Sequence, residues 1–432
     1  MKYLILVPDG AADRKDGPLG DKTPLEIAHM PQTDYLAQHG EIGLVQTIPE
    51  GIKPGSDAAN LAVMGYDPVT DLTGRSPLEA VSMGIEMADT DVAFRTNLVT
   101  LSREEDVPYD GLRITDHSAG DISNEEGRSL IEFIDEKLGA GDPRNNGRVH
   151  FYPGISYRHA LIVNEGKTTA TGIGDVYSQY EGYDLTPPHD ILTRRIGDYL
   201  PVGEGSGFIG ALMRESYELL KNHPINISRR VQGLHTADSI WIWGEGKRPQ
   251  LKSFEEKYGI KGRVISAVDL IKGIGICAGL DSVDVEGATG TIKTNFEGKA
   301  EAVIAAFREG KDFVYVHVEA PDECGHQGDA EGKVQSLEYT DTRLLKPVLK
   351  YLKENLQENG EDYRILIVPD HRTPLSIRTH SSEPVPFVIY DSRRDSGTPD
   401  TSKAFTEAAG GLGRSFASGQ QLADYFFNGE NV

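Results

Sequence analysis

The sequence predicts an α/β protein with a doubly wound core sheet and a smaller α+β insertion domain. Short apolar runs recur along the chain, helical patterns lie between several of them, and acidic or histidine-containing segments follow the runs directly. Strands that are apolar throughout are typical of parallel sheets covered by helices on both faces, because a half-exposed strand would alternate apolar and polar residues. Together these observations favour the doubly wound class.

The expected core elements run along most of the chain. In a doubly wound sheet, ligands bind beyond the carboxyl ends of the strands. The residues that directly follow a predicted strand are therefore the first candidates for a functional site. Central parallel strands are predicted at 3–7, 239–243, 264–268, 313–318, 365–368 and 387–390, and helices at 298–308 and 336–353.

The middle of the chain has a different pattern. Two antiparallel strand pairs with intervening helices indicate an α+β insertion at 88–235, which leaves 1–87 and 236–432 as the core. The Pro- and Gly-rich stretch 186–210 is expected to be an irregular linker or lid. The insertion strands are predicted at 92–101, 113–115, 149–152 and 159–163, and its first helix at 124–137.

Composition excludes several classes of partner. Acidic residues outnumber basic ones 67 to 44 and the formal net charge is −23. Nucleic-acid binding is therefore not expected, because it needs lysine and arginine to neutralise phosphates. No apolar run approaches the roughly 18 residues of a membrane span, so no membrane partner is predicted. Cys277 and Cys324 are too few for a disulfide framework, which predicts a cytoplasmic protein.

Carboxylates and imidazoles follow three of the predicted strands. Each segment alone also fits a bland interpretation, as a capped helix start, a turn or a solvated loop. Because the strand ends meet at one edge of the sheet, we expect the side chains to lie together. The carboxylates are Asp9, Asp322 and Asp370, and the imidazoles are His326, His371 and His380.

This mixed donor set predicts a centre of two divalent metal ions. Oxygen and imidazole ligands suit Zn²⁺ or Mn²⁺ better than Ca²⁺, with Mg²⁺ as a further candidate. A set without sulfur disfavours a structural zinc site. The carboxylates would repel one another in a dehydrated cleft, and bound dications would remove that repulsion.

Ser56 is the candidate nucleophile. It stands at the start of a predicted helix in Pro54-Gly55-Ser56-Asp57-Ala58-Ala59-Asn60. Serine is a good helix N-cap, and the N-terminus of a helix is also a phosphate-binding site. A serine alkoxide beside two metal ions could attack phosphorus, so the cap and nucleophile roles are compatible.

A phosphorylated, acidic substrate needs positive charge from elsewhere in the chain. Arg158, Arg229 and Arg230 in the insertion are candidates because the guanidinium group matches carboxylate and phosphate. Surface arginines are common, so each could equally be structural. Lys272, in an otherwise apolar stretch, could neutralise a leaving oxygen or extend its ammonium group to solvent.

The sequence resembles the archaeal-type cofactor-independent phosphoglycerate mutases of the alkaline phosphatase superfamily. The resemblance covers almost the whole chain. Ordered motifs carry it: Pro8-Asp9-Gly10, Gly55-Ser56-Asp57-Ala58-Ala59-Asn60, Gly65-Tyr66-Asp67-Pro68, Gly74-Arg75-Ser76-Pro77, Asp91-Val92-Ala93-Phe94-Arg95-Thr96-Asn97, Glu286-Gly287-Ala288-Thr289-Gly290, Asp322 to His326, Asp370-His371 and His380-Ser381-Ser382-Glu383-Pro384-Val385-Pro386.

The resemblance implies an isomerase of small phosphorylated acids that uses no 2,3-bisphosphoglycerate. Ser56 would take the phosphoryl group from 3-phosphoglycerate and return it to the 2-hydroxyl, under an insertion that closes over the core. Asp116 would be an acid or base, Lys272 would stabilise the phosphoryl group, and the three arginines would bind substrate. One metal would be held by Asp322, His326 and His380, and the other by Asp9, Ser56, Asp370 and His371.

One position departs from the archaeal pattern. Asp121 stands where those mutases typically carry an arginine, and a bacterial branch described as proposed homoserine kinases has a similar segment. A homoserine kinase-like phosphotransferase therefore stays an alternative, although no Gly-rich nucleotide loop is present. A metal-dependent phosphomonoesterase and a non-catalytic metal-binding protein are further alternatives, and self-association as a homo-oligomer is left open.

Overall fold

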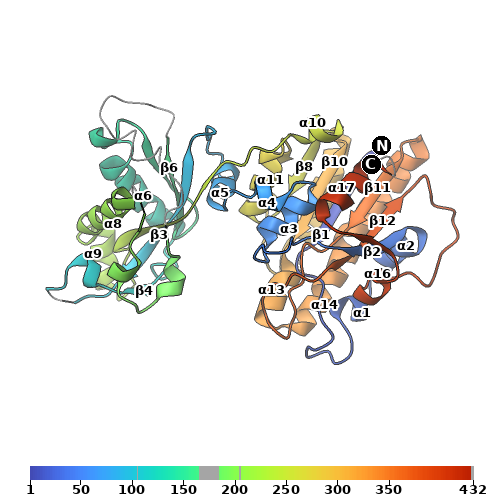
Figure 1. Ribbon diagram of the computed structural model, residues 1–432, viewed down its shortest axis with the longest axis horizontal. Coiled ribbons are helices and arrows are strands. Elements are labelled where there is room, and N and C mark those ends of the chain that lie inside the picture. Colours follow the sequence, from blue (N-terminus) through green and yellow to red (C-terminus); the bar gives the residue numbers. More distant parts are fainter. Residues whose placement is uncertain (105, 165–183, 204–205, 430–432) are drawn as a thin grey trace. The chain divides into compact units, whose positions relative to one another are not determined.

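The computed structural model describes residues 1–104, 106–164, 184–203 and 206–429 (Figure 1). The chain divides into two compact units, Met1–Leu72 with Gln250–Val432, and Thr73–Pro249. The second unit is longer at both ends than the expected insertion at 88–235. The reason is that a helix before residue 88 and a strand after residue 235 both contact the strand Val92–Leu101 of this unit.

A mixed sheet forms the core of the first unit. Its strand order is β13-β2-β12-β11-β1-β10-β8-β9. The central strand β1 is parallel to both neighbours, and Leu4 lies beside Val314 on one side and Ile365 on the other. The strands are β1 (Lys2–Pro8), β2 (Glu41–Val45), β8 (Gly262–Ile265), β9 (Asp281–Ser282), β10 (Phe313–Val318), β11 (Tyr363–Ile367), β12 (Val385–Asp391) and β13 (Arg414–Phe416).

One predicted central strand has the opposite direction. β12 pairs antiparallel with β11 and with β2, so the expected parallel strand at 387–390 is corrected. Every residue of β12 is buried, and a strand covered on both faces is apolar in either direction. Strand direction therefore cannot be told from this apolar run.

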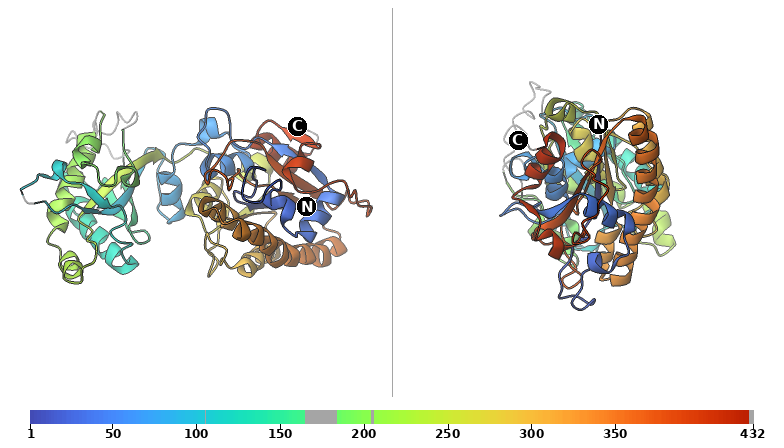
Figure 2. Two further views of the ribbon diagram at one scale, coloured as in Figure 1. Left: turned by 90° about the horizontal axis from the view of Figure 1, so that it is seen from below. Right: turned by 90° about the vertical axis from the view of Figure 1, so that its right-hand side faces the viewer.

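Helices cover both faces of the core sheet. In the right-hand view of Figure 2, the orange-brown run that includes α14 lies on one side and the red α17 lies on the other. α3 contacts α11 and α17, whereas α12 contacts β8, β10 and α15. The helices are α1 (Pro24–Ile27), α2 (Pro31–His39), α3 (Ser56–Val63), α4 (Pro68–Asp71), α10 (Phe254–Tyr258), α11 (Asp269–Cys277), α12 (Phe296–Arg308), α13 (Ala320–Gln327), α14 (Ala330–Tyr339), α15 (Lys346–Tyr351), α16 (Glu407–Gly410) and α17 (Gly419–Asn428).

The helix predicted at 336–353 is a continuous helical run with two widened segments. π-Helical turns occupy η5 (Thr340–Leu345) and η6 (Leu352–Leu356), and the 3₁₀ turn η7 (Gln357–Asn359) ends the run. Pro347 lies two positions after the first of them. Proline cannot donate the helical hydrogen bond to the residue four positions earlier, which accounts for the irregular register.

The second unit is an antiparallel sheet packed against helices. β3 (Val92–Leu101) pairs with β4 (Ile114–Asp116), β6 (Arg158–Val163) and β7 (Ser239–Lys247), and β5 (Val149–Tyr152) pairs with β6. The run 239–243 was expected in the core sheet and instead belongs here, within β7. The helices are α5 (Ser76–Ser82), α6 (Asn124–Leu138), α8 (Ser206–Leu220) and α9 (Pro224–Val231), with 3₁₀ turns η1 (Tyr109–Gly111), η2 (Pro143–Asn145), η3 (Pro188–Ile191) and η4 (Ile196–Tyr199).

The apolar core of this unit lies between the sheet and its helices. Leu98, Leu130, Leu212 and Trp241 are all buried in one cluster. The described part of the stretch 186–210 contains η3, η4 and the start of α8, so it is more regular than expected. Across the described residues, we find no helix that is long and apolar enough to cross a membrane.

Candidate metal centre

Three neighbouring strands bring the predicted carboxylates to one edge of the core sheet. Asp9 follows β1, and its backbone N–H donates to the carbonyl of Val318 at the end of β10 at 2.9 Å. Asp322 lies in the first turn of α13 after β10, and Asp370 follows β11. All three are buried, at 2%, 7% and 0% exposure respectively. The expectation that the carboxyl ends of the strands gather these side chains is met.

The side chains form two donor groups that share one histidine. Asp322, His371 and His380 make the first group, and Asp9, Asp370 and His371 make the second, each with donor atoms within 4.8 Å of one another. His371 Nε2 lies 3.5 Å from Asp9 Oδ1 and 3.4 Å from Asp370 Oδ2. The two groups are therefore parts of one centre.

His326 joins the first group from the same helix as Asp322. The two residues are four positions apart on α13, which places them on one face of the helix. His326 Nε2 lies 3.2 Å from Asp322 Oδ2 and 2.9 Å from His380 Nε2. The structure thus brings together all six predicted carboxylates and imidazoles.

Ser56 lies within hydrogen-bond distance of this centre. Its Oγ is 3.1 Å from His371 Nε2. Ser56 is the first residue of α3, and Gly55 occupies the N-cap position, where no side-chain cap forms. The predicted N-cap role is therefore corrected, because the hydroxyl group contacts the imidazole instead of capping the helix.

Asn60 is a further residue of this site that the sequence analysis did not single out. Its side-chain amide donates to Ser56 O and to Asp370 Oδ2, both at 2.8 Å. Its Oδ1 accepts from the hydroxyl group of Tyr315 at 2.6 Å. The only available signal was the i, i+4 spacing from Ser56, which places both residues on one face of α3.

Burial and neighbouring groups shift the pKa values of Asp9 and Asp322 in opposite directions. Burial and the neighbouring charge of Asp370 raise the pKa of Asp9 well above its ordinary value. Burial opposes ionisation of Asp322 as well, but hydrogen bonds from His326 and His380 hold its pKa well below the usual range. Asp322 in turn raises the pKa of His326 to about 9.

The donor set fits divalent cations. Asp9 Oδ1 is buried and accepts no hydrogen bond from any described residue, which leaves a carboxylate oxygen for a cation. Carboxylate and imidazole donors without sulfur suit Zn²⁺ or Mn²⁺. Gly10 makes room for this packing, because a Cβ there would lie 2.5 Å from Asp322 Oδ1.

Comparison with known proteins agrees with this chemistry. The family model described as 2,3-bisphosphoglycerate-independent phosphoglycerate mutase matches residues 37–226. A Methanosarcina barkeri protein of that name is 46% identical over 407 residues, which cover 94% of each chain. The chain belongs to this family. A Geobacter sulfurreducens protein named as a probable mutase of the same kind is 48% identical over 90% of each chain.

Solved structures support the fold of this mutase family. A Pyrococcus horikoshii protein superposes with a TM-score of 0.76 at 26% identity, over 100% of this chain and 98% of the other. A cofactor-independent phosphoglycerate mutase from Thermoplasma acidophilum superposes with a TM-score of 0.64 at 24% identity, over 99% of each chain. The likeness to the second shows the fold alone.

In this member of the mutase family, the predicted basic residues have different environments. Arg158 is exposed at the start of β6, and its guanidinium group contacts Tyr157, with 3.2 Å from Nε to the phenol oxygen. Arg230 is half-buried and donates to Lys221 O at 2.7 Å. Lys272 forms ion pairs with Asp269 at 2.9 Å and Asp284 at 3.0 Å.

Arg229 is a structural residue rather than a free cation. It is only 4% exposed. Its guanidinium group pairs with Glu126 and donates to His235 O at 2.7 Å and to Ala119 O at 2.9 Å. These contacts join α9 to α6 and to the loop before it, and the expected substrate contact of Arg229 stays a prediction.

Asp116 is held as a carboxylate at the end of β4. It accepts from the N–H and the hydroxyl group of Ser118, both at 2.7 Å, and lies 3.1 Å from His235 Nδ1. Burial opposes ionisation, but these hydrogen bonds and that of Gly120 keep its pKa below the ordinary value. Asp116 is therefore ionised near neutral pH and has no proton to supply.

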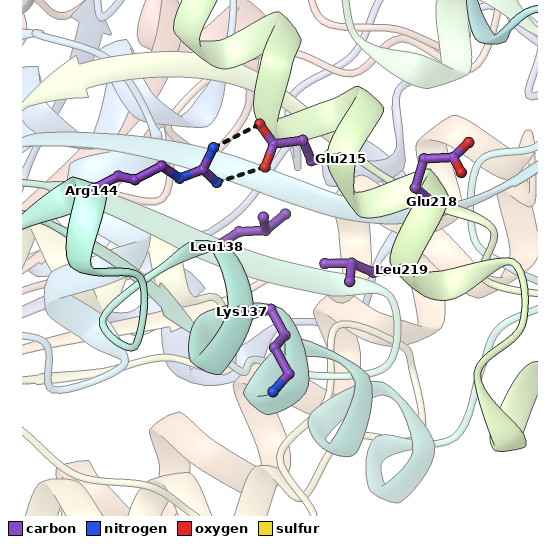
Figure 3. A pocket seen from close by; sticks show the side chains of 6 residues that line it. All are labelled: Lys137, Leu138, Arg144, Glu215, Glu218 and Leu219. Atoms are coloured by element: carbon purple, nitrogen blue, oxygen red, sulfur yellow. Dashed lines mark hydrogen bonds and ion pairs between the residues drawn. The ribbon is translucent and has the colours of Figure 1, made fainter.

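A hollow in the second unit has no link to this chemistry. It has a volume of about 330 Å³ and lies between α6, the turn η2 and α8 (Figure 3). In Figure 3, Arg144 reaches across to Glu215, with nitrogen–oxygen distances of 2.6 and 3.3 Å. The lining includes no predicted metal ligand or nucleophile. It consists of Lys137, Leu138, Arg144, Glu215, Glu218 and Leu219.

Proposed function

We propose that this protein is a phosphoglycerate mutase that interconverts 3-phosphoglycerate and 2-phosphoglycerate through a phosphoserine at Ser56, without 2,3-bisphosphoglycerate. One observation carries the proposal: Ser56 Oγ lies 3.1 Å from Nε2 of His371, the histidine shared by both donor groups. A nucleophile in contact with two groups of cation ligands is the arrangement that phosphoryl transfer needs. The named mutases that share most of the chain support the same activity.

Two divalent ions, Mn²⁺ or Zn²⁺ with Mg²⁺ as a further candidate, are the proposed cofactors. When bound, they would favour the serine alkoxide and neutralise the charge of the phosphoryl oxygens. Asp322, His326 and His380 would hold one ion. Asp9, Ser56, Asp370 and His371 would hold the other.

The chain's own residues account for the transfer. Ser56 Oγ attacks phosphorus, its hydroxyl proton passes to the 3-oxygen as the bond from phosphorus to that oxygen breaks, and glycerate is left with a free 3-hydroxyl group. The 2-hydroxyl of the same glycerate then attacks the phosphoserine, and the bond to Oγ breaks. Asp116, held ionised by Ser118 and Gly120, is the proposed acceptor of the 2-hydroxyl proton and returns it to Ser56 Oγ, which restores the free serine.

Substrate binding is proposed for the basic residues that remain available. Arg158 is exposed and its planar guanidinium group matches carboxylate and phosphate groups. Arg230 and Lys272 are proposed to assist, although each already contacts protein groups. Arg229 is left out because of its burial.

Product analysis tests the proposal. Purified protein with Mn²⁺ is given 3-phosphoglycerate, and ³¹P NMR follows the products. We expect 2-phosphoglycerate without free phosphate. Release of phosphate alone would indicate a phosphomonoesterase, and phosphohomoserine formed only from ATP and homoserine would indicate a kinase.

Acid quenching with ³²P-labelled substrate tests the intermediate. We expect label on the wild-type protein and none on Ser56→Ala. Ser402→Ala is the matched control, since its hydroxyl group donates to Asp400 in an exposed turn. Full turnover by Ser56→Ala would contradict the phosphoserine.

A further inference from the structure

Thr373 connects the two donor groups without belonging to either. It is fully buried, at 0% exposure, in the segment after Asp370 and His371. Its Oγ1 forms a hydrogen bond with Asp322 Oδ1 and lies 3.2 Å from His371 Nδ1. One hydroxyl group thus contacts a carboxylate of the first group and the histidine that both groups share.

The chemistry of these three groups decides the direction of both hydrogen bonds. An ionised carboxylate only accepts, so the single hydroxyl proton of Thr373 goes to Asp322. The hydroxyl oxygen then accepts from His371, which requires the proton of the imidazole to be on Nδ1. The Nε2 lone pair of His371 is consequently free on the side that faces Ser56, Asp9 and Asp370.

The backbone of Thr373 is held firmly in place. Its carbonyl oxygen accepts from Lys333 Nζ at 2.7 Å, and Lys333 forms an ion pair with Asp13 at 2.8 Å. Lys333 and Asp13 are 0% and 1% exposed, so solvent screens this pair little. Asp13 also accepts from the backbone N–H of Leu375 at 3.2 Å, which ties down the segment that follows Thr373.

The side chain is confined as well. A Cβ at Gly10 would lie 2.6 Å from Thr373 Oγ1, and a Cβ at Gly325 would lie 2.8 Å from Thr373 Cγ2. The two glycines therefore let neighbouring backbone approach the hydroxyl and methyl groups closely. A side chain that is enclosed in this way keeps the rotamer that makes both hydrogen bonds.

We propose that Thr373 is a positioning residue that couples the two metal-binding groups. It orients Asp322, holds His371 with its proton on Nδ1, and so presents Nε2 to the shared side of the centre. The inference rests on the proposed two-ion centre. Groups that orient metal ligands in this way contribute about 10- to 100-fold to metal affinity in other proteins.

Metal binding by two matched variants tests the role. Thr373→Val keeps the shape but removes the hydroxyl group, whereas Thr373→Ser keeps the hydroxyl group. Mn²⁺ binding is measured by competition with a fluorescent chelator, without substrate. We expect two ions per chain in the wild type, affinities within about 3-fold of it for Thr373→Ser, and about 10- to 100-fold weaker binding of both ions for Thr373→Val.

The outcomes separate this inference from the function on which it rests. A wild-type protein that binds fewer than two ions overturns the proposed centre. Two ions bound equally well by the wild type and by Thr373→Val overturn only the role of Thr373. Weaker binding of one ion alone also overturns it, because the hydroxyl group contacts residues of both groups.

A second measurement does not depend on a folded Thr373 variant. In the Zn²⁺-loaded wild-type protein, ¹⁵N NMR of histidine side chains is expected to show His371 protonated on Nδ1 and coordinated through Nε2. The His371→Gln variant assigns the signal. Coordination through Nδ1 would overturn the inference even if Thr373→Val does not fold.

Discussion

The side-chain amide of Asn60 bridges the backbone of Ser56 and the carboxylate of Asp370, with donor–acceptor distances of 2.8 Å to each. A single buried amide therefore sets the first turn of α3 against a predicted metal ligand. Tyr315 completes the arrangement from β10 by donating to Asn60 Oδ1 at 2.6 Å. This side chain thus links the proposed nucleophile to the candidate metal centre, in addition to the direct contact of Ser56 with His371.

Replacing Asn60 by alanine is expected to impair transfer and stability together. The change leaves Asp370 and Ser56 without their common donor in a buried site, which costs about 1–3 kcal/mol in free energy of unfolding. We expect a loss in kcat of at least about 100-fold in the activity assay. Urea denaturation of the same samples measures the loss in free energy of unfolding. Tyr315→Phe is the matched control, since it removes one hydrogen bond to Asn60 but keeps the bridge. Equal losses in both variants would contradict the special position of Asn60.

Substitution of Gly10 by alanine is expected to disrupt the metal centre. Gly10 has φ +60°, and a Cβ would lie 2.5 Å from Asp322 Oδ1 and 2.6 Å from Thr373 Oγ1. Gly20 has a similar φ of +72° with no atom within 4 Å, so Gly20→Ala adds only the backbone strain of about 1 kcal/mol. Calorimetry with and without Mn²⁺ measures the Tm of the Gly10→Ala and Gly20→Ala variants. If both variants kept the Mn²⁺-dependent rise in Tm, the close packing at Gly10 would be unimportant.

The two adjacent arginines of α9 are expected to behave differently. Arg229→Ala removes a pair with the half-buried Glu126 and leaves the carbonyl oxygens of His235 and Ala119 without this donor, for which we expect a loss of about 2–3 kcal/mol in the stability of the second unit. Arg230 is half-buried with one carbonyl contact, so Arg230→Ala is expected to lose about 1 kcal/mol. Urea denaturation followed by tryptophan fluorescence measures both, because Trp241 and Trp243 both lie on β7. A larger loss for Arg230→Ala would show that we have assigned the structural role to the wrong arginine.

Acid is expected to destabilise the second unit through His159. Burial lowers the pKa of His159 from 6.5 to about 3. Its Nδ1 accepts from the backbone N–H of Gly154 at 3.1 Å, which requires the neutral ring. The unfolded chain binds a proton below pH 6.5 that the folded unit does not. The stabilisation is therefore complete above pH 6.5 and falls by about 1.4 kcal/mol for each unit down to about pH 3.

Tryptophan fluorescence during urea unfolding at several pH values checks this dependence. His159→Asn keeps an acceptor for Gly154 but does not titrate in this range. We expect its stability to vary less between pH 6.5 and pH 4 than that of the wild type. Parallel pH profiles for the two proteins would rule out His159 as the origin.

Chelation is expected to silence the reaction and destabilise only the first unit. Asp9, Asp322 and Asp370 are buried together, and their mutual repulsion grows when no cation is bound. With EDTA we expect the calorimetric transition of this unit to move to lower temperature, and Mn²⁺ to restore it. The tryptophan-reported transition of the second unit should stay where it is. Turnover at full rate in EDTA would contradict the two-ion proposal.

The candidate site was more predictable from sequence than the arrangement of the strands. Asp9, Asp322 and Asp370 follow buried strands, and parallel neighbours must end at one edge, so their meeting follows from local pattern alone. The apolar run within β7 shows the limit of that reasoning. It has the composition of a core strand, but it pairs antiparallel with β3 in the other unit because its apolar faces are buried there.

The linear sequence by itself determined which residue types follow each strand, that a serine begins α3, and that the chain carries carboxylates and imidazoles enough for two cations. Only the tertiary structure decided that Arg229 is buried, that Asn60 bridges Ser56 and Asp370, and that Thr373 contacts both donor groups. The physical reason is that burial and hydrogen-bond partners come from residues far apart in the chain. Thr373 and Asp322 are 51 positions apart, and Asn60 and Asp370 are 310 apart.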